Sequence, residues 1–169
     1  MFLASELPVM LDEGESAPDF TAPLATGEDI EQLTLSDALD EGPVVLAFFP
    51  GAFTSVCSHE MTSFRNRLPA FEERGVNLYG VSVDSPFALN AFHDELDLNF
   101  PLISDANDEL IERYDVSMDF ADLGVYDVAE RAVYVVDTDR TITYAWVGDD
   151  PGVEPDYDAV EAAVSELTD

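Results

Sequence analysis

The apolar run VVLAFF, at Val44–Phe49, limits most strongly what this chain can fold into. A strand with one face in water alternates apolar and polar residues, whereas a continuous apolar run is typical of a strand covered on both faces. The segment that follows carries apolar side chains at spacings of three, four and three, the stripe that a packed helix presents. These residues are Met61, Phe64, Leu68 and Phe71. The region therefore predicts a central strand followed by a helix in an α/β domain.

The remainder of the chain continues this alternation of strands and helices. We expect strands at 76–83, 100–103, 132–136 and 141–147, helices at 85–96, 106–114 and near the C-terminus, and an irregular or hairpin-forming lead-in at 1–30. Two strand–helix–strand units followed by a hairpin predict a central mixed sheet flanked by helices. We predict one domain over residues 1–169, with residues 1–15 as an irregular N-terminal extension. Sites in such sheets lie beyond the carboxyl ends of strands, which places a site at residues 50–57.

The charge of the chain is extreme, with 37 acidic residues, six arginines, no lysine and a net charge of −31 at pH 7. The acidic residues are spread along the sequence, whereas an acidic tail or a docking patch for a basic partner would be local. At about 1 M salt the Debye length is about 3 Å, which removes most of the resulting self-repulsion. The composition therefore resembles that of proteins from halophilic archaea that accumulate salt. Nucleic-acid binding is not expected, because phosphate contacts need clustered Lys or Arg.

The sequence also indicates a cellular setting. No apolar run approaches the ~18 residues of a membrane span, and the first residues, which contain both Met1 and Met10 as possible starts, lack the basic segment of a signal peptide. With one cysteine no intrachain disulfide can form, and we expect a reducing cytoplasm. Two histidines and one cysteine supply too few soft ligands for a structural zinc site, and we predict no metal and no cofactor.

The single cysteine, Cys57, falls where the predicted helix begins. If the helix starts near Ser55, Cys57 lies in its first turn, where free backbone N–H groups and the helix dipole favour a thiolate. Thr54 is placed either to bring its hydroxyl beside the sulfur or to cap the helix, and Pro50 and Phe53 are placed to limit access of water. A lone intracellular cysteine is also commonly a small buried apolar residue. Position alone therefore leaves a reactive and an inert cysteine open.

A sequence motif favours the reactive cysteine. The pattern Pro50-x-x-x-Thr54-x-x-Cys57, within FFPGAFTSVCSHE, closely resembles the active-site motif of peroxiredoxins, thiol peroxidases with a thioredoxin-like fold. The resemblance continues in APDF, LSDAL, VSVDSP, FPLISD and RAVYVVD, in the order found in that family. It implies a thioredoxin-like peroxiredoxin fold and reduction of hydrogen peroxide, with organic hydroperoxides as further substrates.

The resemblance also assigns roles to four residues. Cys57 would attack the peroxide and become a sulfenic acid, Thr54 would hydrogen-bond the thiolate and the peroxide, and Pro50 would shield the site. Arg131 would hold the thiolate and stabilise the departing oxygen. In molar salt a distant charge is screened, so Arg131 must act at contact distance in a site shut off from solvent. Without the resemblance, the favoured interpretation of Arg131 is a surface ion-pair member at the start of a strand.

Two further side chains near Cys57 have open roles. Glu60 either pairs with an arginine or is a solvated acid of the first helical turns. His59 either assists proton transfer or lies on the surface beside the helix start.

The chain departs from the two-cysteine members of the family. Position 60 is Glu, position 62 is Thr, and the C-terminal region has no cysteine, so this chain cannot resolve its own sulfenic acid. The pattern is similar to the one-cysteine, AhpE-like subgroup and implies an external thiol or a thioredoxin- or glutaredoxin-like reductant. Relatives commonly form homodimers, and we expect one here. The alternatives are another thioredoxin-fold thiol enzyme and a non-enzymatic redox-sensing or chaperone-like module.

Overall fold

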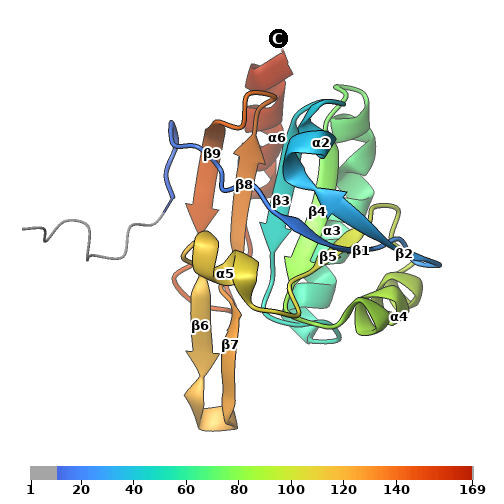
Figure 1. The fold of residues 1–169 in the computed structure, drawn as a ribbon, viewed down its shortest axis with the longest axis vertical. Coiled ribbons are helices and arrows are strands. Elements are labelled where there is room, and N and C mark those ends of the chain that lie inside the picture. Colours follow the sequence, from blue (N-terminus) through green and yellow to red (C-terminus); the bar gives the residue numbers. More distant parts are fainter. Residues whose placement is uncertain (1–10, 169) are drawn as a thin grey trace, which may run out of the picture.

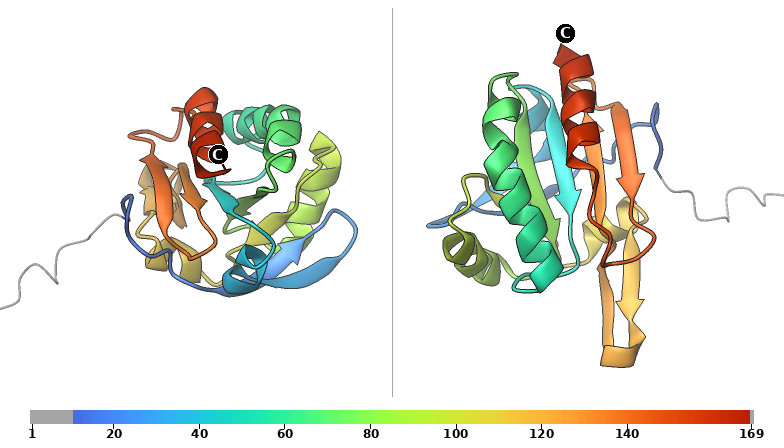
Figure 2. Two further views of the ribbon diagram at one scale, coloured as in Figure 1. Left: turned by 90° about the horizontal axis from the view of Figure 1, so that it is seen from above. Right: turned by 180° about the vertical axis from the view of Figure 1, so that it is seen from behind.

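The computed structural model describes residues 11–168 and shows a mixed sheet with helices on both faces (Figures 1 and 2). Within these residues, seven strands form the main sheet in the order β2-β1-β5-β4-β3-β8-β9. They are β1 (Thr21–Ala25), β2 (Ile30–Thr34), β3 (Val44–Phe48), β4 (Asn77–Ser82), β5 (Leu102–Ser104), β8 (Ala132–Val136) and β9 (Ile142–Val147). The α-helices are α2 (Leu35–Leu39), α3 (Ser55–Glu72), α4 (Pro86–Leu96), α5 (Glu109–Arg113) and α6 (Tyr157–Thr168).

The connections follow the predicted units. Strands β3, β4 and β5 are parallel neighbours, linked by α3 and α4, and β8 and β9 form an antiparallel hairpin beside β3. The lead-in also forms a hairpin, because β1 pairs with β2 and its other edge pairs antiparallel with β5. The part of the N-terminal extension at residues 1–10 lies outside the described residues.

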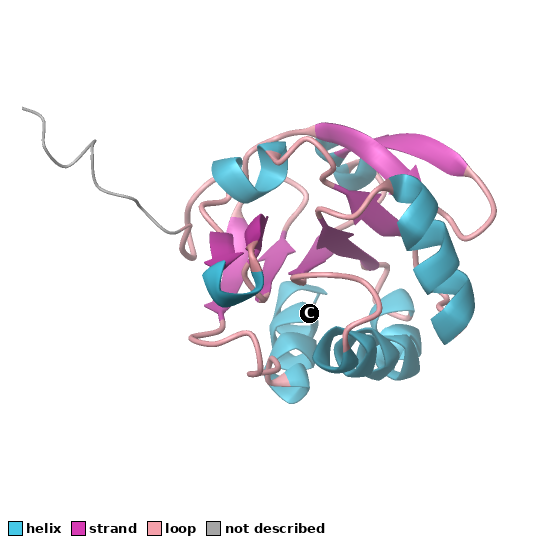
Figure 3. Ribbon diagram, turned by 90° about the horizontal axis from the view of Figure 1, so that it is seen from below, coloured by secondary structure: helices cyan, strands magenta, loops and turns pink. Residues whose placement is uncertain are grey.

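Strand β3 lies inside the sheet, between β4 and β8, and is buried along its whole length. Successive side chains of a strand point to opposite faces. Val45, Ala47 and the following Phe49 therefore join the apolar core beneath α3, α4 and α6, whereas Leu46 and Phe48 join the core on the other face. Figure 3 shows helices above and below the strands. The apolar run thus forms a doubly covered strand, as predicted.

Helix α3 packs very closely against the sheet at one glycine. A Cβ atom at Gly80 of β4 would lie 3.0 Å from the sulfur of Met61 and 2.7 Å from the side chain of Leu102. A larger residue at position 80 would force the ends of the Met61 and Leu102 side chains to shift.

Two features differ from the sequence prediction. Helix α5 begins at Glu109 rather than near residue 106, because Asp108 has a left-handed backbone (φ 59°) and the Asp105 carboxylate accepts the N–H groups of Leu110 and Ile111. The chain then forms an unpredicted two-stranded ribbon of β6 (Ser117–Phe120) and β7 (Val125–Ala129), joined by the short turn η1 (Ala121–Leu123). The ribbon projects from the body of the molecule (Figure 1).

Candidate active site

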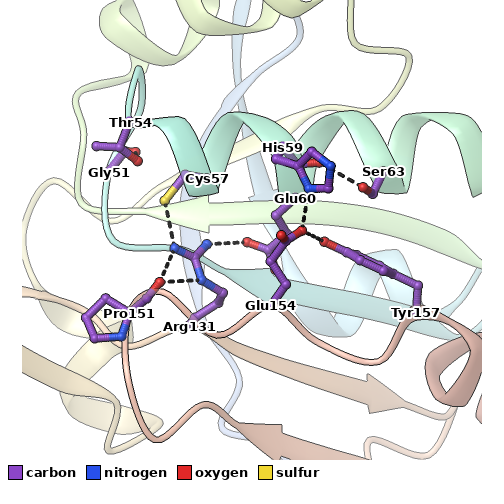
Figure 4. Close-up of polar contacts among 10 residues, drawn as sticks. All are labelled: Gly51, Thr54, Cys57, His59, Glu60, Ser63, Arg131, Pro151, Glu154 and Tyr157. Atoms are coloured by element: carbon purple, nitrogen blue, oxygen red, sulfur yellow. Dashed lines mark hydrogen bonds and ion pairs between the residues drawn. The ribbon is translucent and has the colours of Figure 1, made fainter.

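The cysteine lies at the start of α3, beyond the carboxyl end of β3. Helix α3 begins at Ser55, as predicted, and Cys57 in its first turn is 1% exposed. Thr54 occupies the N-cap position, but its side chain makes no cap hydrogen bond and instead donates to the Gly51 carbonyl over 3.0 Å. Within the described residues, Thr54 also makes no hydrogen bond to the sulfur (Figure 4). The Thr54 hydroxyl therefore makes neither a capping hydrogen bond nor one to the sulfur.

Arg131 directly precedes β8, the antiparallel neighbour of β3, and this pairing brings it beneath the first turn of α3. Its Nη2 donates to Cys57 Sγ over 3.3 Å, and its Nη1 donates to Glu60 Oε1 over 2.7 Å. Its Nε and Nη2 also donate to the Pro151 carbonyl, over 3.1 and 2.7 Å. The residue is 2% exposed, so it is not a surface ion-pair member. The expected contact distance and solvent exclusion are both present.

Glu60 is the second acid that Arg131 contacts. It lies one helical turn after Cys57 on the same face of α3 and is fully buried, which rules out a solvated acid and confirms the pairing with an arginine. Burial raises the pKa of Glu60 to about 8, although Arg131 acts in the opposite direction. For Arg131, burial disfavours the charged form, but Glu60 and Cys57 raise its pKa, so the guanidinium keeps its charge.

A second polar cluster lies behind the first. Glu154, in the loop before α6, accepts a hydrogen bond from the hydroxyl of Tyr157, and its Oε1 lies 2.6 Å from Nδ1 of His59 (Figure 4). Burial opposes the charged form of Glu154, but the bonds from Tyr157 and His59 hold its pKa below the ordinary value. The His59 side chain is 69% exposed, which agrees with the surface alternative. The loop segment DDPGVEPDY carries no motif, so Pro151 and Glu154 were not predicted.

A cavity of about 630 Å³ opens at Cys57. Pro50, Thr54, Cys57 and Arg131 all line it, so the structure brings the four predicted residues to one site. Its remaining wall is largely apolar and comes in part from the ribbon: Val56, Val83, Phe120, Leu123, Val125, Tyr126 and Val128.

Pro50 is buried at this cavity, whereas Phe53 is not one of its lining residues. Phe53 has a left-handed backbone (φ 66°), is 57% exposed and packs edge-on against Phe92 of α4 at 5.2 Å. Phe53 therefore packs against α4 and does not line this cavity.

The side chain of Asp84, which follows the carboxyl end of β4, supports the loop of residues 50–54. Asp84 accepts the N–H of Ala52 over 2.8 Å and the hydroxyl of Ser82 over 2.7 Å. The hydroxyl of Ser104, at the end of β5, donates to the Asp84 carbonyl over 2.6 Å. The carboxyl ends of neighbouring strands thus hold the strained loop in place.

Residues 11–168 contain no cluster of three or more His, Cys, Asp or Glu side chains arranged to hold a metal ion. Over the same residues, none of the helices combines the length and apolar character needed to span a membrane.

Comparison with known proteins identifies the family. The AhpC/TSA family model matches residues 14–145. The chloroplastic 2-cysteine peroxiredoxin of Chattonella marina var. antiqua is 37% identical over 142 residues, which are 79% of this chain and 69% of that protein. Alkyl hydroperoxide reductase C of Helicobacter pylori (strain J99) is 32% identical over 144 residues, 80% of this chain and 70% of that protein. The chain belongs to the AhpC/TSA family of peroxiredoxins, which are thiol peroxidases.

Solved structures agree with this assignment. The crystal structure of peroxidoxin BcpB from Mycobacterium tuberculosis matches with a TM-score of 0.82 at 28% identity, covering 94% of this chain and 99% of that chain. The reduced 2-Cys peroxiredoxin of Plasmodium vivax also matches with a TM-score of 0.82, at 25% identity, covering 92% of this chain and 81% of that chain. The predicted thioredoxin-like peroxiredoxin fold is confirmed. The two-cysteine relatives differ from this chain, which has one cysteine.

Proposed function

We propose that this protein reduces hydrogen peroxide and organic hydroperoxides by a one-cysteine mechanism in which Cys57 is the reacting thiol. The observation that carries the proposal is the 3.3 Å contact between the Arg131 guanidinium and the Cys57 sulfur at the end of an open cavity. A buried cation at contact distance and a helix N-terminus both favour the thiolate, which is the nucleophilic form.

The chemistry follows from the groups around the sulfur. The thiolate attacks one peroxide oxygen, the O–O bond breaks, and Cys57 becomes a sulfenic acid while an alkoxide or hydroxide departs. Arg131 supplies fixed N–H donors where negative charge moves from the sulfur to the departing oxygen. Thr54 lies at the mouth of the cavity, and rotation of its hydroxyl away from Gly51 would place a further donor at the peroxide. Such bonds often tighten only when substrate is bound.

The shape and lining of the cavity support organic hydroperoxides as substrates beside hydrogen peroxide. A volume of about 630 Å³ is far more than hydrogen peroxide fills, since a water molecule occupies about 30 Å³. Valine, leucine and aromatic side chains of the ribbon face this space and would pack against the carbon skeleton of a hydroperoxide.

An external reductant completes the proposed cycle. Because this chain has a single cysteine, a small thiol or a thioredoxin- or glutaredoxin-like protein must reduce the sulfenic acid, as in the AhpE-like subgroup. We place the enzyme in the cytoplasm of a halophilic archaeon, on the strength of its charge and cysteine content. We expect a homodimer, because relatives commonly form one.

Multiple-turnover peroxide consumption tests the function. The protein, in molar KCl, is given peroxide and either small thiols or redoxins, and Cys57 is monitored by mass for the sulfenic acid. We expect catalytic turnover with at least one reductant and none for Cys57→Ser. A single round of oxidation that changes the assembly state, without turnover, would instead support a redox-sensing or chaperone-like module.

A further inference from the structure

The single positive charge of Arg131 contacts two acidic side chains at the centre of the site. Arg131 contacts Glu60 and Cys57, and each of the three residues is at most 2% exposed. Its other acceptor, the Pro151 carbonyl, is neutral. If Glu60 and Cys57 were both deprotonated, two anions would be buried against one cation. An unmatched buried charge is costly, so one of the two acids should hold a proton.

The surroundings of Glu60 decide which acid holds the proton. Its Oε2 atom is buried and has no hydrogen-bond partner among residues 11–168. Arg131 and the carboxylate of Glu154 act on Glu60. Glu60 in turn acts on Tyr157, whose hydroxyl donates to Glu154 instead. Burial and, to a smaller degree, Glu154 favour the neutral form of Glu60, against the pull of Arg131. Protonation of Glu60 at this oxygen costs little, because no hydrogen bond to the charged form is lost there.

We propose that Cys57 and Glu60 share one proton, so that the Cys57 thiolate forms while Glu60 is a neutral carboxyl group. This inference rests on the proposed peroxidase function for its consequence. When the thiolate attacks ROOH, the S–O bond forms, the O–O bond breaks and RO⁻ departs. Glu60 then loses its proton, which neutralises RO⁻ to ROH by way of water. The pair S⁻ and COOH becomes SOH and COO⁻, so the charge of the site is unchanged and Arg131 stays paired throughout.

The thiolate titration of three proteins tests the shared proton. The ultraviolet absorbance of the thiolate is followed against pH, in molar KCl, for the wild type, Glu60→Gln and Glu130→Gln. Glutamine at position 60 keeps an oxygen that accepts from Arg131 but removes the competing acid. Glu130 is the matched control, because it adjoins Arg131 in sequence but is not in its bonding network. No peroxide is involved, so this result is independent of the proposed function.

We expect the midpoint of thiolate formation to stay within about 0.3 pH units of the wild type in both variants, because glutamine at position 60 imitates the neutral carboxyl group that accompanies the thiolate. A midpoint that falls or rises by about one pH unit or more in Glu60→Gln, a tenfold change in the equilibrium, overturns the proposal. A lower midpoint would mean that Glu60 is ionised while the thiol titrates, and a higher one that the Glu60 carboxylate stabilises the thiolate by orienting Arg131.

Infrared difference spectroscopy tests the proposal on the wild-type protein, so the result does not depend on whether a variant folds. The spectrum of the reduced protein is subtracted from that of the protein oxidised by hydrogen peroxide at neutral pH. We expect the carbonyl band of a buried, protonated carboxyl group to disappear and a carboxylate band to appear. Oxidation of Cys57 without this exchange overturns the shared proton and leaves the peroxidase function standing. If peroxide does not oxidise Cys57, the proposed function fails, and the thiolate titration alone tests whether Cys57 and Glu60 share one proton.

Discussion

On one side of the Cys57 sulfur lies a buried cation with several hydrogen bonds, and on the other lies an exposed loop beside an open cavity. Arg131 is held by Glu60 and by the Pro151 carbonyl and is 2% exposed. Thr54, by contrast, is exposed and bonds only to the neighbouring Gly51 carbonyl. The two sides therefore differ in burial, in charge and in the number of bonds that fix them.

This difference suggests that the two sides of the site have different functions. The buried side must hold a charge at a fixed distance, which requires rigid partners and exclusion of solvent. The open side must admit peroxides of different size and later a reductant, which requires access. We therefore expect changes on the Arg131 side to act on all substrates and on stability. Changes on the loop and ribbon side should act more weakly and selectively.

The largest effect is expected for Arg131→Lys. Lysine keeps the charge, but its compact ammonium group cannot reproduce the fork of donors that spans Glu60, the sulfur and Pro151. The rate constant for oxidation of Cys57 by hydrogen peroxide should fall at least about 100-fold, the typical cost of losing a fixed donor to a developing anion. Stopped-flow fluorescence measures it. Arg113→Lys, at an exposed pair with Glu109, is the control and should change the rate less than about twofold.

Glu60→Ala should give the largest loss of stability. The substitution leaves the Nη1 donor of the buried, charged Arg131 without the oxygen that accepts it, which should lower the free energy of unfolding by about 3 kcal/mol. Glu109→Ala removes an exposed carboxylate from an ion pair and should cost at most about 0.5 kcal/mol. Denaturant titration in molar KCl gives both values. Similar losses in the two variants would show that the Arg131 side is not held more firmly than the surface.

Thr54→Val should have a smaller effect than changes at Arg131. It removes one neutral hydroxyl donor while keeping the shape of the side chain, and one hydrogen bond of about 1.4 kcal/mol corresponds to about tenfold in rate. Thr54→Ser keeps the hydroxyl and should stay near the wild-type rate constant for peroxide. A Thr54→Val protein as fast as the wild type would remove Thr54 from the reaction.

Phe120→Ala should separate large from small peroxides. Phe120 lines the cavity from the ribbon, and its loss removes apolar contact with the carbon skeleton of an organic hydroperoxide. We expect the rate constant for an aromatic hydroperoxide to fall about fivefold, against less than about twofold for hydrogen peroxide. Equal losses for both peroxides would mean that the cavity does not select the substrate.

The smallest kinetic effect is expected from salt, which should change the stability of this acidic protein but hardly the rate at the buried site. The net charge of −31 predicts that the melting temperature rises markedly between dilute buffer and about 1 M KCl, where the Debye length is about 3 Å. Above that concentration the rate of Cys57 oxidation should change less than about twofold, because the Arg131–sulfur contact is buried. A melting temperature independent of salt would contradict the halophilic interpretation.

The parts of the fold that the sequence predicted are those with strong periodic signals. The buried strand after residue 43, the stripe of α3, and the cap of α4 by Ser85 are all found where expected. The ribbon of β6 and β7 was missed because its strands are short and largely exposed, so no apolar pattern marks them.

The candidate site was predictable only as far as motifs reach. The motif names Cys57, Thr54 and Pro50, and the resemblance at RAVYVVD names Arg131. The pairing of Glu60 with Arg131 depends on β8 lying next to β3, which no local pattern encodes. Pro151 contributes through its backbone carbonyl, and any residue type has one. No sequence pattern marks the left-handed backbone of Phe53 or the hydrogen bond from Ala52 to Asp84 that supports its loop, so both are evident only in the structure.

The central claim, that Arg131 and the first turn of α3 make Cys57 a peroxide-reactive thiolate, is tested most directly by comparing two reagents. The rate constants of Cys57 with hydrogen peroxide and with iodoacetamide are measured at one pH in molar KCl and divided by those of a free thiol of matched ionisation. We predict that the peroxide reaction is accelerated by orders of magnitude and alkylation is not, since only peroxide needs donors for a departing oxygen. Equal ratios for the two reagents, as for an ordinary thiol, would contradict the claim.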